Sequence, residues 1–405
     1  MSLLSRIRSW FSVKDAPPVF PANTRLLSGE DLVRENFEHG VEMLNDDATP
    51  MEFVVGVLMR HVQMNRDEAI KAMLKIHSTG RLAIPLASRE LAEHIATLVS
   101  SAARQQNHPL VCRPVTAQQR VHKTTVPFAP DRRSMRLSTG QSLSYYVVGT
   151  QHTSTPILLL HGIPDASDSW DSIAAQLEDA HPVYAVDLVG YGNSDCSEGQ
   201  NVSLSAQADY VREFLVKLEL SRVILVGHDI GGGVAQILAV HDPQRVYRLV
   251  LINSVIHDHW PVLEMRMLRV PVLGYTALTL LEKPMWRYIL HKGFFNKQAV
   301  TESVLHRYQR WYQGAIGRRR LVRNARALDH SDLTTLADAI RTLPMPALML
   351  WGRTDRFLNA EPAQALCRDL PDCRFSFIER GGHFVLDEQS PILADTIRQF
   401  LLRKQ

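Results

Sequence analysis

Short runs of consecutive apolar residues recur along the carboxyl-terminal two thirds of the chain. Turn formers and polar residues bound each run, and most of the segments between them have the three-to-four-residue apolar spacing of amphipathic helices. Strands that are apolar at every position are typical of a parallel sheet covered by helices on both faces. We therefore predict strands of such a sheet at residues 157–160, 182–188, 222–226, 249–252 and 347–351.

One long stretch interrupts this alternation, at about residues 256–340. It contains no strand-like run and consists of helix-like segments rich in Leu, Arg and aromatic residues. It is inserted between two predicted strands of the sheet, so we predict that it forms a helical lid.

Changes in composition mark the ends of two domains. A Pro-rich segment near residue 17 and a polar, basic segment with three prolines at 113–133 cannot continue a helix or a strand. Near the amino terminus, Leu3, Leu4, Ile7, Trp10 and Phe11 share one helical face, which either docks on a partner or membrane surface or belongs to a frayed helix. We expect a leader helix and linker at 1–36, a small domain at 37–115, a linker at 116–133 and a large domain at 134–405.

Composition and charge narrow the classes of protein that fit. The chain has 405 residues, 45% of them hydrophobic, which excludes wholesale disorder. Lys and Arg number 45 against 42 Asp and Glu, so the charge excess of a nucleic-acid-binding protein is absent. No apolar run reaches the roughly 18 residues that a membrane-spanning helix needs. The four cysteines, Cys112, Cys196, Cys367 and Cys373, form no CxxC pair, so we interpret them as free thiols of a cytoplasmic protein.

The run Gly227-His-Asp-Ile-Gly231 follows a predicted strand and precedes a predicted helix. This is the arrangement of a nucleophile elbow, a tight turn that exposes one side chain to the pocket, with Asp229 at the position of the nucleophile. A carboxylate is ionised at neutral pH and can attack an electrophilic carbon directly, which forms an alkyl ester. We predict that Asp229 is the nucleophile.

Hydrolysis of such an ester requires a base, a group that orients the base, and donors for the oxyanion. His383 follows the last strand-like segment, and Asp355 follows the strand at 347–351, so the order along the chain is nucleophile, acid, histidine. The backbone N–H groups of Ile163, just after the first strand, and of Ile230 can form an oxyanion hole. The chain has no phosphate-binding Gly motif and no cluster of metal ligands, so we expect no cofactor and no metal.

Residues 134–405 therefore resemble the α/β-hydrolase fold, and the Asp elbow places them near the epoxide hydrolases and the haloalkane and haloacetate dehalogenases. Dehalogenases of this type stabilise the halide or the substrate carboxylate with side chains at two positions that are occupied here by Ile163 and Ile230. Epoxide hydrolases protonate the departing oxygen with lid tyrosines, and the resemblance favours their activity over dehalogenation. The lid contains Tyr275, Tyr288, Tyr308 and Tyr312, and which of them donates the proton stays open.

The small domain begins with a strand-like run at 41–44 and a helix start. Thr49 is the predicted N-cap, Pro50 the first helical residue and Glu52 the reciprocal partner of a capping box. A second helix is predicted at 67–76, before His77.

Segments 45–54, 69–77 and 107–112 resemble ClpS, the α+β adaptor that delivers substrates with bulky apolar amino-terminal residues to the Clp protease. The resemblance implies that Asn45, Asp46 and His77 hold a free α-ammonium group by charge-assisted hydrogen bonds. It also implies an apolar pocket walled by Thr49, Met51, Val54, Met73, Ile76 and Leu110. In the family, a Glu and a Lys five residues later contact the unfoldase; here Glu90 is present, but Ile95 replaces the Lys.

Together, these observations predict a cytoplasmic protein with an α+β ClpS-like domain followed by an α/β-hydrolase domain with a helical lid. The favoured activity is two-step, epoxide-hydrolase-like hydrolysis of a small molecule. The expected partners of the small domain are peptides with bulky apolar amino termini and a Clp unfoldase. Two alternatives stay open: a dehalogenase or other small-molecule hydrolase, and a non-enzymatic Clp adaptor whose hydrolase fold acts as a receptor.

Overall fold

The computed structural model of the chain describes residues 39–44, 46, 49–79, 81–86, 88–116, 128, 130–257, 260–270, 275, 278–279 and 282–402. Contacts divide the chain into two compact units, residues 1–127 and 128–405. The predicted leader helix at 1–36 lies outside the described residues, as do residues 117–127 of the predicted linker. Within the described ranges, no helix is both long enough and apolar enough to span a bilayer.

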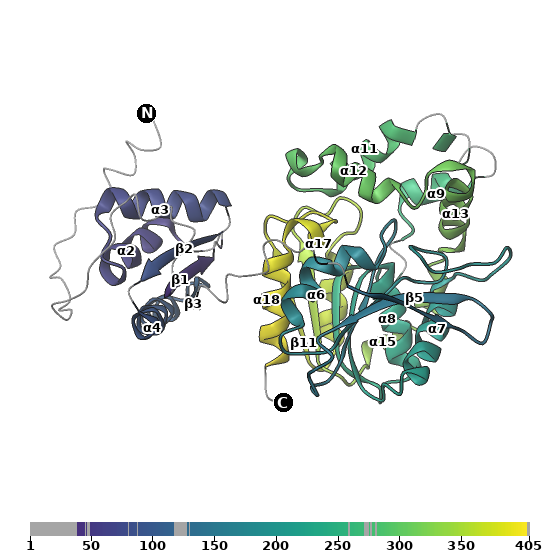
Figure 1. Cartoon of the computed structure of the whole chain (residues 1–405), viewed down its shortest axis with the longest axis horizontal. Coiled ribbons are helices and arrows are strands. Elements are labelled where there is room, and N and C mark those ends of the chain that lie inside the picture. Colours follow the sequence, from purple (N-terminus) through teal and green to yellow (C-terminus); the bar gives the residue numbers. More distant parts are fainter. Residues whose placement is uncertain are drawn as a thin grey trace. The chain divides into compact units, whose positions relative to one another are not determined.

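The small unit is an antiparallel three-stranded sheet packed with three helices (Figure 1). Its elements are β1 (His39–Leu44), α2 (Met51–His61), α3 (Arg66–Thr79), β2 (Arg81–Leu86), α4 (Arg89–Gln105) and β3 (Val111–Thr116). β1 is the central strand and pairs with β2 on one side and β3 on the other. Every element contributes to one apolar core, which includes Val41, Leu58, Ile76, Ile84, Val99 and Cys112. The predicted α+β class is confirmed.

The predicted capping box at Thr49 is wrong. α2 begins at Met51, its cap residue is Pro50, and no side chain caps it. Instead, the backbone N–H and the hydroxyl of Thr49 both donate to the carboxylate of Asp46, at 2.6 and 2.8 Å. A charged acceptor three residues earlier forms stronger hydrogen bonds than a hydroxyl–amide cap would, so Thr49 closes the turn before the helix instead.

The large unit is built on an eight-stranded mixed sheet. Its strands are β4 (Arg132–Arg136), β5 (Ser142–Val148), β6 (Ile157–Leu160), β7 (Val183–Val186), β8 (Val223–Asp229), β9 (Val246–Ser254), β10 (Ala347–Gly352) and β11 (Cys373–Ile378). Their spatial order is β11-β10-β9-β8-β6-β7-β5-β4. All pairs from β7 to β11 are parallel, whereas β5 pairs antiparallel with β7 and β4 pairs antiparallel with β5.

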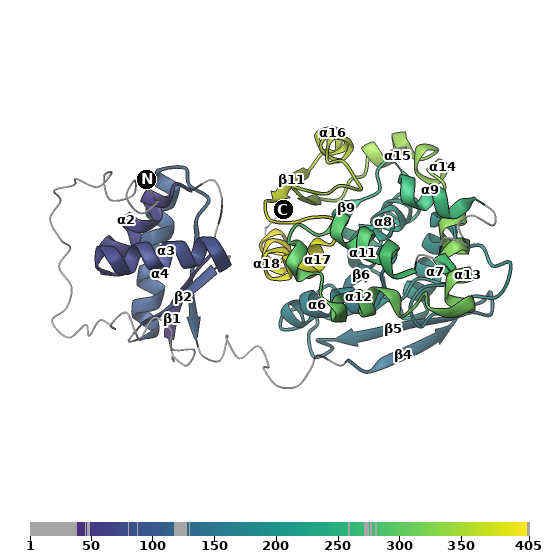
Figure 2. The same ribbon diagram turned by 90° about the horizontal axis from the view of Figure 1, so that it is seen from above.

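Helices cover both faces of this sheet (Figure 2). Leu158 and Leu160 of β6 face one core together with α7 (Leu204–Lys217) and α8 (Ile230–His241). Ile157 and Leu159 of the same strand face a second core. The second core includes side chains of α6 (Asp171–Leu177), α17 (Val385–Glu388) and α18 (Ser390–Leu401). The continuous apolar runs therefore arise because each strand is buried on both sides.

The five predicted strands are confirmed and pair in parallel, but the sequence analysis missed an antiparallel edge of the sheet. The hairpin of β4 and β5 adds two antiparallel strands there. β4 has the sequence Arg-Arg-Ser-Met-Arg and is largely exposed. An edge strand needs no apolar run and is often charged, so hydrophobic patterning does not reveal it.

Most of the lid helices lie together at one end of the sheet, at the top of Figure 1. They are α9 (Leu263–Arg269), α11 (Glu282–Gly293), α12 (Glu302–Gln309) and α13 (Gly314–Ala327). The two helices that follow, α14 (Ser331–Thr334) and α15 (Ala337–Arg341), pack against α8 instead. The helical lid inserted between β9 and β10 is confirmed.

The interpretation of all four cysteines as free thiols is wrong for two of them. Cys367 and Cys373 form a disulfide, with Cα atoms 5.2 Å apart. Cys367 lies near the end of α16 (Glu361–Asp369), and the chain turns back directly into β11, where Cys373 is the first residue. The tight αβ connection therefore brings two cysteines together that have no recognisable spacing motif. Cys112 and Cys196 are free thiols.

Candidate functional site

Asp229 lies at a strained turn between β8 and α8. Its φ of 51° and ψ of −120° place a non-glycine residue at positive φ. The turn is tightly packed: a Cβ at Gly231 would lie 2.3 Å from the carbonyl oxygen of Leu160, and one at Gly162 would lie 2.6 Å from the Cβ of Asp229. The sequence at the elbow is therefore constrained by close packing, and the turn holds the carboxylate at the end of the central strand.

Backbone N–H groups surround the carboxylate of Asp229. The N–H of Ile163 donates to its Oδ2 atom at 2.9 Å, and the N–H of Ile230 also donates to this carboxylate. Burial raises the pKa of Asp229 above its ordinary value, while the charge of His383 and these two N–H groups oppose that rise. Oδ2 of Asp229 is thus engaged by the backbone N–H of Ile163, one of the two predicted oxyanion donors.

His383 and Asp355 form a buried pair. Nδ1 of His383 lies 2.9 Å from Oδ2 of Asp355. The N–H groups of Phe357 and Leu358 donate to Oδ1 of the same carboxylate, at 2.7 and 3.0 Å. Burial works against ionisation of Asp355, but the charge and hydrogen bond of His383 keep its pKa below the ordinary value. Asp355 is therefore an ionised acceptor that directs Nε2 of His383 away from itself.

The pKa of His383 reflects its two carboxylate neighbours. Burial lowers this pKa, but the charge of Asp355, its hydrogen bond and the charge of Asp229 raise it to about 9. The structure thus brings Asp229 and His383 to one pocket, with Asp355 behind the imidazole.

Two positioning residues were missed by the sequence analysis. Asn253, at positive φ near the end of β9, donates to Asp355 at 2.6 Å and to the carbonyl of Gly382 at 3.3 Å, and it accepts from the N–H of Gly352 at 3.0 Å. His228 donates from Nε2 to the backbone carbonyl of His383 at 3.0 Å. Burial lowers the pKa of His228 to about 3, so its ring is neutral. The elbow motif contains His228, whereas no local signal marks Asn253.

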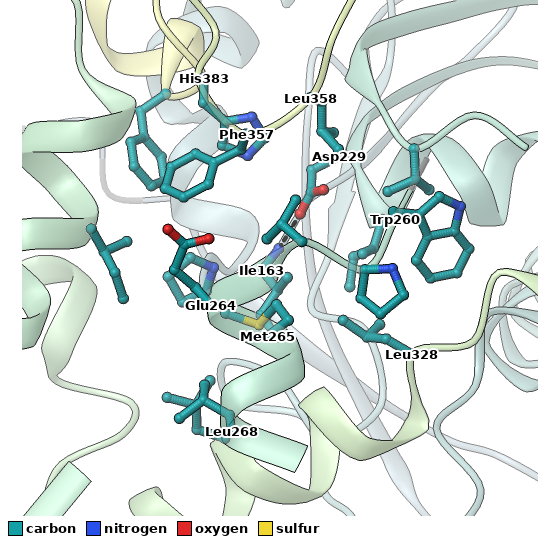
Figure 3. A pocket seen from close by; sticks show the side chains of 18 of the residues that line it. Ile163, Asp229, Trp260, Glu264, Met265, Leu268, Leu328, Phe357, Leu358 and His383 are labelled. Atoms are coloured by element: carbon teal, nitrogen blue, oxygen red, sulfur yellow. Dashed lines mark hydrogen bonds between the residues drawn. The ribbon is translucent and has the colours of Figure 1, made fainter. Parts of the chain in front are cut away.

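The pocket above Asp229 encloses about 650 Å³ of empty space, part of which opens to solvent. Figure 3 shows Asp229 joined to Ile163 by its hydrogen bond, with His383 and Phe357 beside it. The rest of the wall is mainly apolar and comes from the lid and the strand ends: Pro164, Ile230, Val255, Trp260, Pro261, Val262, Glu264, Met265, Leu268, Trp286, Ile289, Leu321, Leu328, Leu358 and Phe384. Such a site suits a small apolar substrate with few polar groups.

None of the four lid tyrosines lines the pocket above Asp229. Tyr308 donates to Asp387 at 2.6 Å, and Tyr312 is buried and stacked on Trp286 with ring centroids 5.7 Å apart. Tyr288 is 57% exposed, and the ring of Tyr275 lies near Arg318. The indole N–H of Trp260 donates to the carbonyl of His257 at 2.8 Å. No group of three or more potential metal ligands occurs among the described residues.

A second hollow lies in the small unit and encloses about 760 Å³, part of it open to solvent. All of the predicted peptide-binding residues that the structure describes surround it, together with Pro50: Asp46, Thr49, Met51, Val54, Met73, Ile76, His77 and Leu110. They come from α2, α3 and the segments that precede α2 and β3. The remaining predicted residue, Asn45, lies outside the described residues.

The family model of the alpha/beta hydrolase family matches residues 157–396, more than half of the chain. The chain belongs to the alpha/beta hydrolase family. This match covers the elbow, the histidine loop and the lid, and with the relatives below it identifies the large unit as an α/β-fold hydrolase. The model of the ATP-dependent Clp protease adaptor protein ClpS matches residues 34–113 of the same chain. The predicted fusion is therefore confirmed.

Curated relatives match about two thirds of the chain. An uncharacterized protein of Mycobacterium tuberculosis is 27% identical over 301 residues, which cover 71% of this chain and 86% of that protein. Epoxide hydrolase 4 of Mus musculus is 26% identical over 284 residues, which cover 64% of this chain and 76% of that protein.

Solved structures share the fold at low identity. The epoxide hydrolase CorEH matches with a TM-score of 0.59 at 22% identity, over 67% of this chain and 98% of that one. A loop variant of the haloalkane dehalogenase DbeA of Bradyrhizobium elkanii matches with a TM-score of 0.58 at 20% identity, over 67% of this chain and 97% of that one. At this identity, the two structures establish the common fold alone.

Proposed function

We propose that the large domain hydrolyses epoxides in two steps, through an ester between Asp229 and the substrate. The observation that carries this proposal is the carboxylate at the strained elbow, which faces an apolar pocket and lies beside the His383–Asp355 pair. A serine at this position would favour attack on carbonyl groups, whereas a carboxylate forms a stable ester only with an alkyl carbon. The likeness to Epoxide hydrolase 4 of Mus musculus supports the same reaction class.

In the first step, Oδ1 of Asp229 attacks a ring carbon of the epoxide. The carbon–oxygen bond of the ring breaks, and its electron pair stays on the departing oxygen, which takes a proton from water in the pocket. The product of this step is a hydroxyalkyl ester of Asp229. Its carbonyl oxygen is Oδ2, the atom that already accepts the hydrogen bond from Ile163.

In the second step, Nε2 of neutral His383 takes a proton from water, and the resulting hydroxide attacks the carbonyl carbon of the ester. The oxyanion forms on Oδ2, where the N–H groups of Ile163 and Ile230 stabilise it. The intermediate then expels the diol, which takes the proton from His383 and leaves Asp229 as a carboxylic acid. The proton of this acid passes to solvent and neutralises the hydroxide released in the first step, which restores the carboxylate of Asp229. Asp355 stabilises the imidazolium throughout.

The charge of Asp229 couples the two steps. The ionised carboxylate raises the pKa of His383. Before alkylation, the imidazole ring is therefore mainly protonated. Ester formation removes this negative charge, so the pKa of His383 falls and the ring loses its proton more readily. Alkylation thereby prepares the base for the step in which a base is needed.

A second candidate is dehalogenation, and one observation favours it. A halide leaves without a proton, whereas the oxygen of an epoxide needs one. None of the four lid tyrosines lines the pocket above Asp229 to supply that proton. Against it, the indole N–H of Trp260 is already bonded to His257, so this side chain does not serve the halide.

The test is turnover of a panel that pairs terminal alkyl epoxides with haloalkanes of the same chain length. Epoxide hydrolysis predicts diol formation from the epoxides at rates above those for the haloalkanes. Halide release without diol formation would replace the proposal with dehalogenation. Turnover of neither class would favour the alternative that the hydrolase fold acts as a non-enzymatic receptor.

For the small domain, we propose that it binds peptides whose first residue is large and apolar. The hollow combines an apolar wall from Val54, Met73 and Ile76 with polar groups from Asp46 and His77. A free α-ammonium group needs such acceptors when the side chain beside it is buried. The match to the ClpS family model supports this assignment.

We expect His77→Ala to weaken the binding of Leu- or Phe-initiated peptides about tenfold or more, because one charge-assisted hydrogen bond to the ammonium is lost. Fluorescence anisotropy of labelled peptides measures this affinity. His94→Ala, the same substitution at an exposed position of α4, is the matched control and should leave the affinity unchanged. Equal affinities of the two variants, or undiminished binding of amino-terminally acetylated peptides, would contradict the assignment.

Docking to a Clp unfoldase receives less support. Ile95, at the position of the family's lysine, is 3% exposed and belongs to the core of the small domain. It therefore presents no charge to a partner. The proposal for the small domain is therefore peptide binding.

The proposed compartment is the cytoplasm, since an ATP-dependent Clp protease requires intracellular ATP. The disulfide between Cys367 and Cys373 is the observation that counts against it, because cytoplasmic thiols are usually kept reduced.

A further inference from the structure

Besides Asp229 and His383, one ionisable residue lines the described pocket, and the proposed reaction does not use it. This residue is Glu264, in the first turn of α9 in the lid. Figure 3 shows its carboxylate extending in the direction of Phe357. Its side chain is only 12% exposed. A carboxylate in an otherwise apolar wall requires an explanation.

The two oxygens of Glu264 have different surroundings. Oε1 forms an ion pair with Nζ of Lys292 and accepts a hydrogen bond from the hydroxyl of Tyr288 at 3.2 Å, both from α11. Nζ of Lys292 also lies 4.5 Å from the ring centroid of Phe357. Oε2 is fully buried and has no hydrogen-bond partner among the described residues. The contacts with α11 therefore explain only one of the two oxygens.

The ion pair determines what Oε2 can bind. A carboxylate paired with an ammonium is ionised, and an ionised carboxylate only accepts hydrogen bonds. A buried acceptor without a partner is costly, and a ligand donor that enters the pocket and displaces the side chains covering Oε2 removes that cost. We propose that Glu264 accepts a hydrogen bond from a hydroxyl group of the substrate, at a position remote from the carbon that Asp229 attacks.

A hydroxyl group fits this position better than an ammonium group. Lys292 already compensates the charge of Glu264. A second cation would lose its hydration in an apolar pocket without gaining an unpaired counter-charge. The inferred substrate is therefore an apolar epoxide with a neutral hydroxyl at its far end, and this inference rests on the proposed epoxide hydrolysis.

The test compares three terminal epoxides of equal length whose far end carries a hydroxyl, a methyl or a ketone oxygen. For the wild type we expect kcat/KM to be highest for the hydroxyl compound, by about tenfold over the methyl compound. The ketone compound should be the poorest, because it brings an acceptor to an acceptor.

Glu264→Gln keeps the shape of the side chain but changes its polarity. Its carbonyl oxygen will face the ammonium of Lys292, which turns the NH₂ group toward the pocket. We expect the ketone compound to rise above the methyl compound in this variant. In Glu264→Leu, the preference for the hydroxyl compound should disappear. Glu302→Gln, the same substitution at a lid glutamate that is 71% exposed and does not line the pocket, is the control and should keep the order of the wild type.

An unchanged order in Glu264→Gln, or a wild type that does not distinguish hydroxyl from methyl, would overturn the inference. A measurement without chemistry separates it from the proposed reaction. Calorimetry of the wild type with an unreactive straight-chain alcohol and the alkane of equal length should show tighter binding of the alcohol, and Glu264→Leu should remove the difference. If no epoxide is turned over but this difference is found, the reaction fails while the role of Glu264 stands.

Discussion

We expect Asp229→Asn to abolish hydrolysis, with kcat lower than that of the wild type by a factor of about 10⁴ or more. An amide is uncharged, and its oxygen is a poor nucleophile toward an alkyl carbon, so the first step fails. The fold should persist, because the introduced amide has the same shape and its oxygen can still accept from the N–H of Ile163. Removal of a charge whose burial is unfavourable will not lower the free energy of unfolding.

The measurement is steady-state turnover of the best epoxide, together with thermal unfolding to verify the fold. Asp209→Asn, the same substitution at a side chain of α7 that is 61% exposed, is the matched control and should retain full activity. Because an amide at an active carboxylate position can itself be hydrolysed, Asp229→Ala provides a second variant that cannot revert. Substantial activity in both Asp229 variants would assign the nucleophile to another residue.

The sequence predicts the centre of the large domain well, since each central strand is buried on both faces. β6 is an example: its consecutive residues Leu158 and Leu159 enter different cores, so every position is apolar. The edge strand β4 follows no such rule, because its residues are mostly exposed and its pairing with β5 is a tertiary contact. Patterning therefore identifies the strands that hold the elbow but misses the edge.

The candidate site also contains residues that the sequence predicts and residues that it does not. Asp229, Asp355 and His383 follow strand ends, where the topology of a parallel sheet gathers side chains, so motif and order suffice to predict their association. Asn253 connects Asp355 with the loop of His383 through side-chain bonds to residues about a hundred positions away. No local pattern encodes such a bridge. The pocket walls depend on lid packing, so no local pattern predicts that Glu264 lines the pocket and that the four lid tyrosines do not.

In the small domain, resemblance was more informative than local rules. The capping pattern at Thr49 does not predict its role, because its hydroxyl donates to the nearby carboxylate of Asp46. The positions transferred from the family nevertheless surround one hollow, apart from Asn45, which lies outside the described residues. Side chains that wall a pocket come from separate helices, and only the fold brings them together.

The second large effect is expected in His383→Ala, where the two steps of the reaction should separate. Alkylation requires only the carboxylate of Asp229, whereas hydrolysis of the ester requires a base. Loss of the positive ring raises the pKa of Asp229, since His383 normally lowers it. The reaction should therefore be run at mildly alkaline pH, where the carboxylate stays ionised. We expect turnover to fall by about 10⁴-fold while the ester accumulates.

Intact mass of His383→Ala after incubation with an epoxide that the wild type hydrolyses is the most direct test of the nucleophile and of the two-step reaction. The proposal predicts a gain of one substrate mass per chain, localised by peptide mapping to the segment that contains Asp229, and no gain in the double variant that also carries Asp229→Asn. An unmodified protein, or a gain in mass that persists in the double variant, would contradict it.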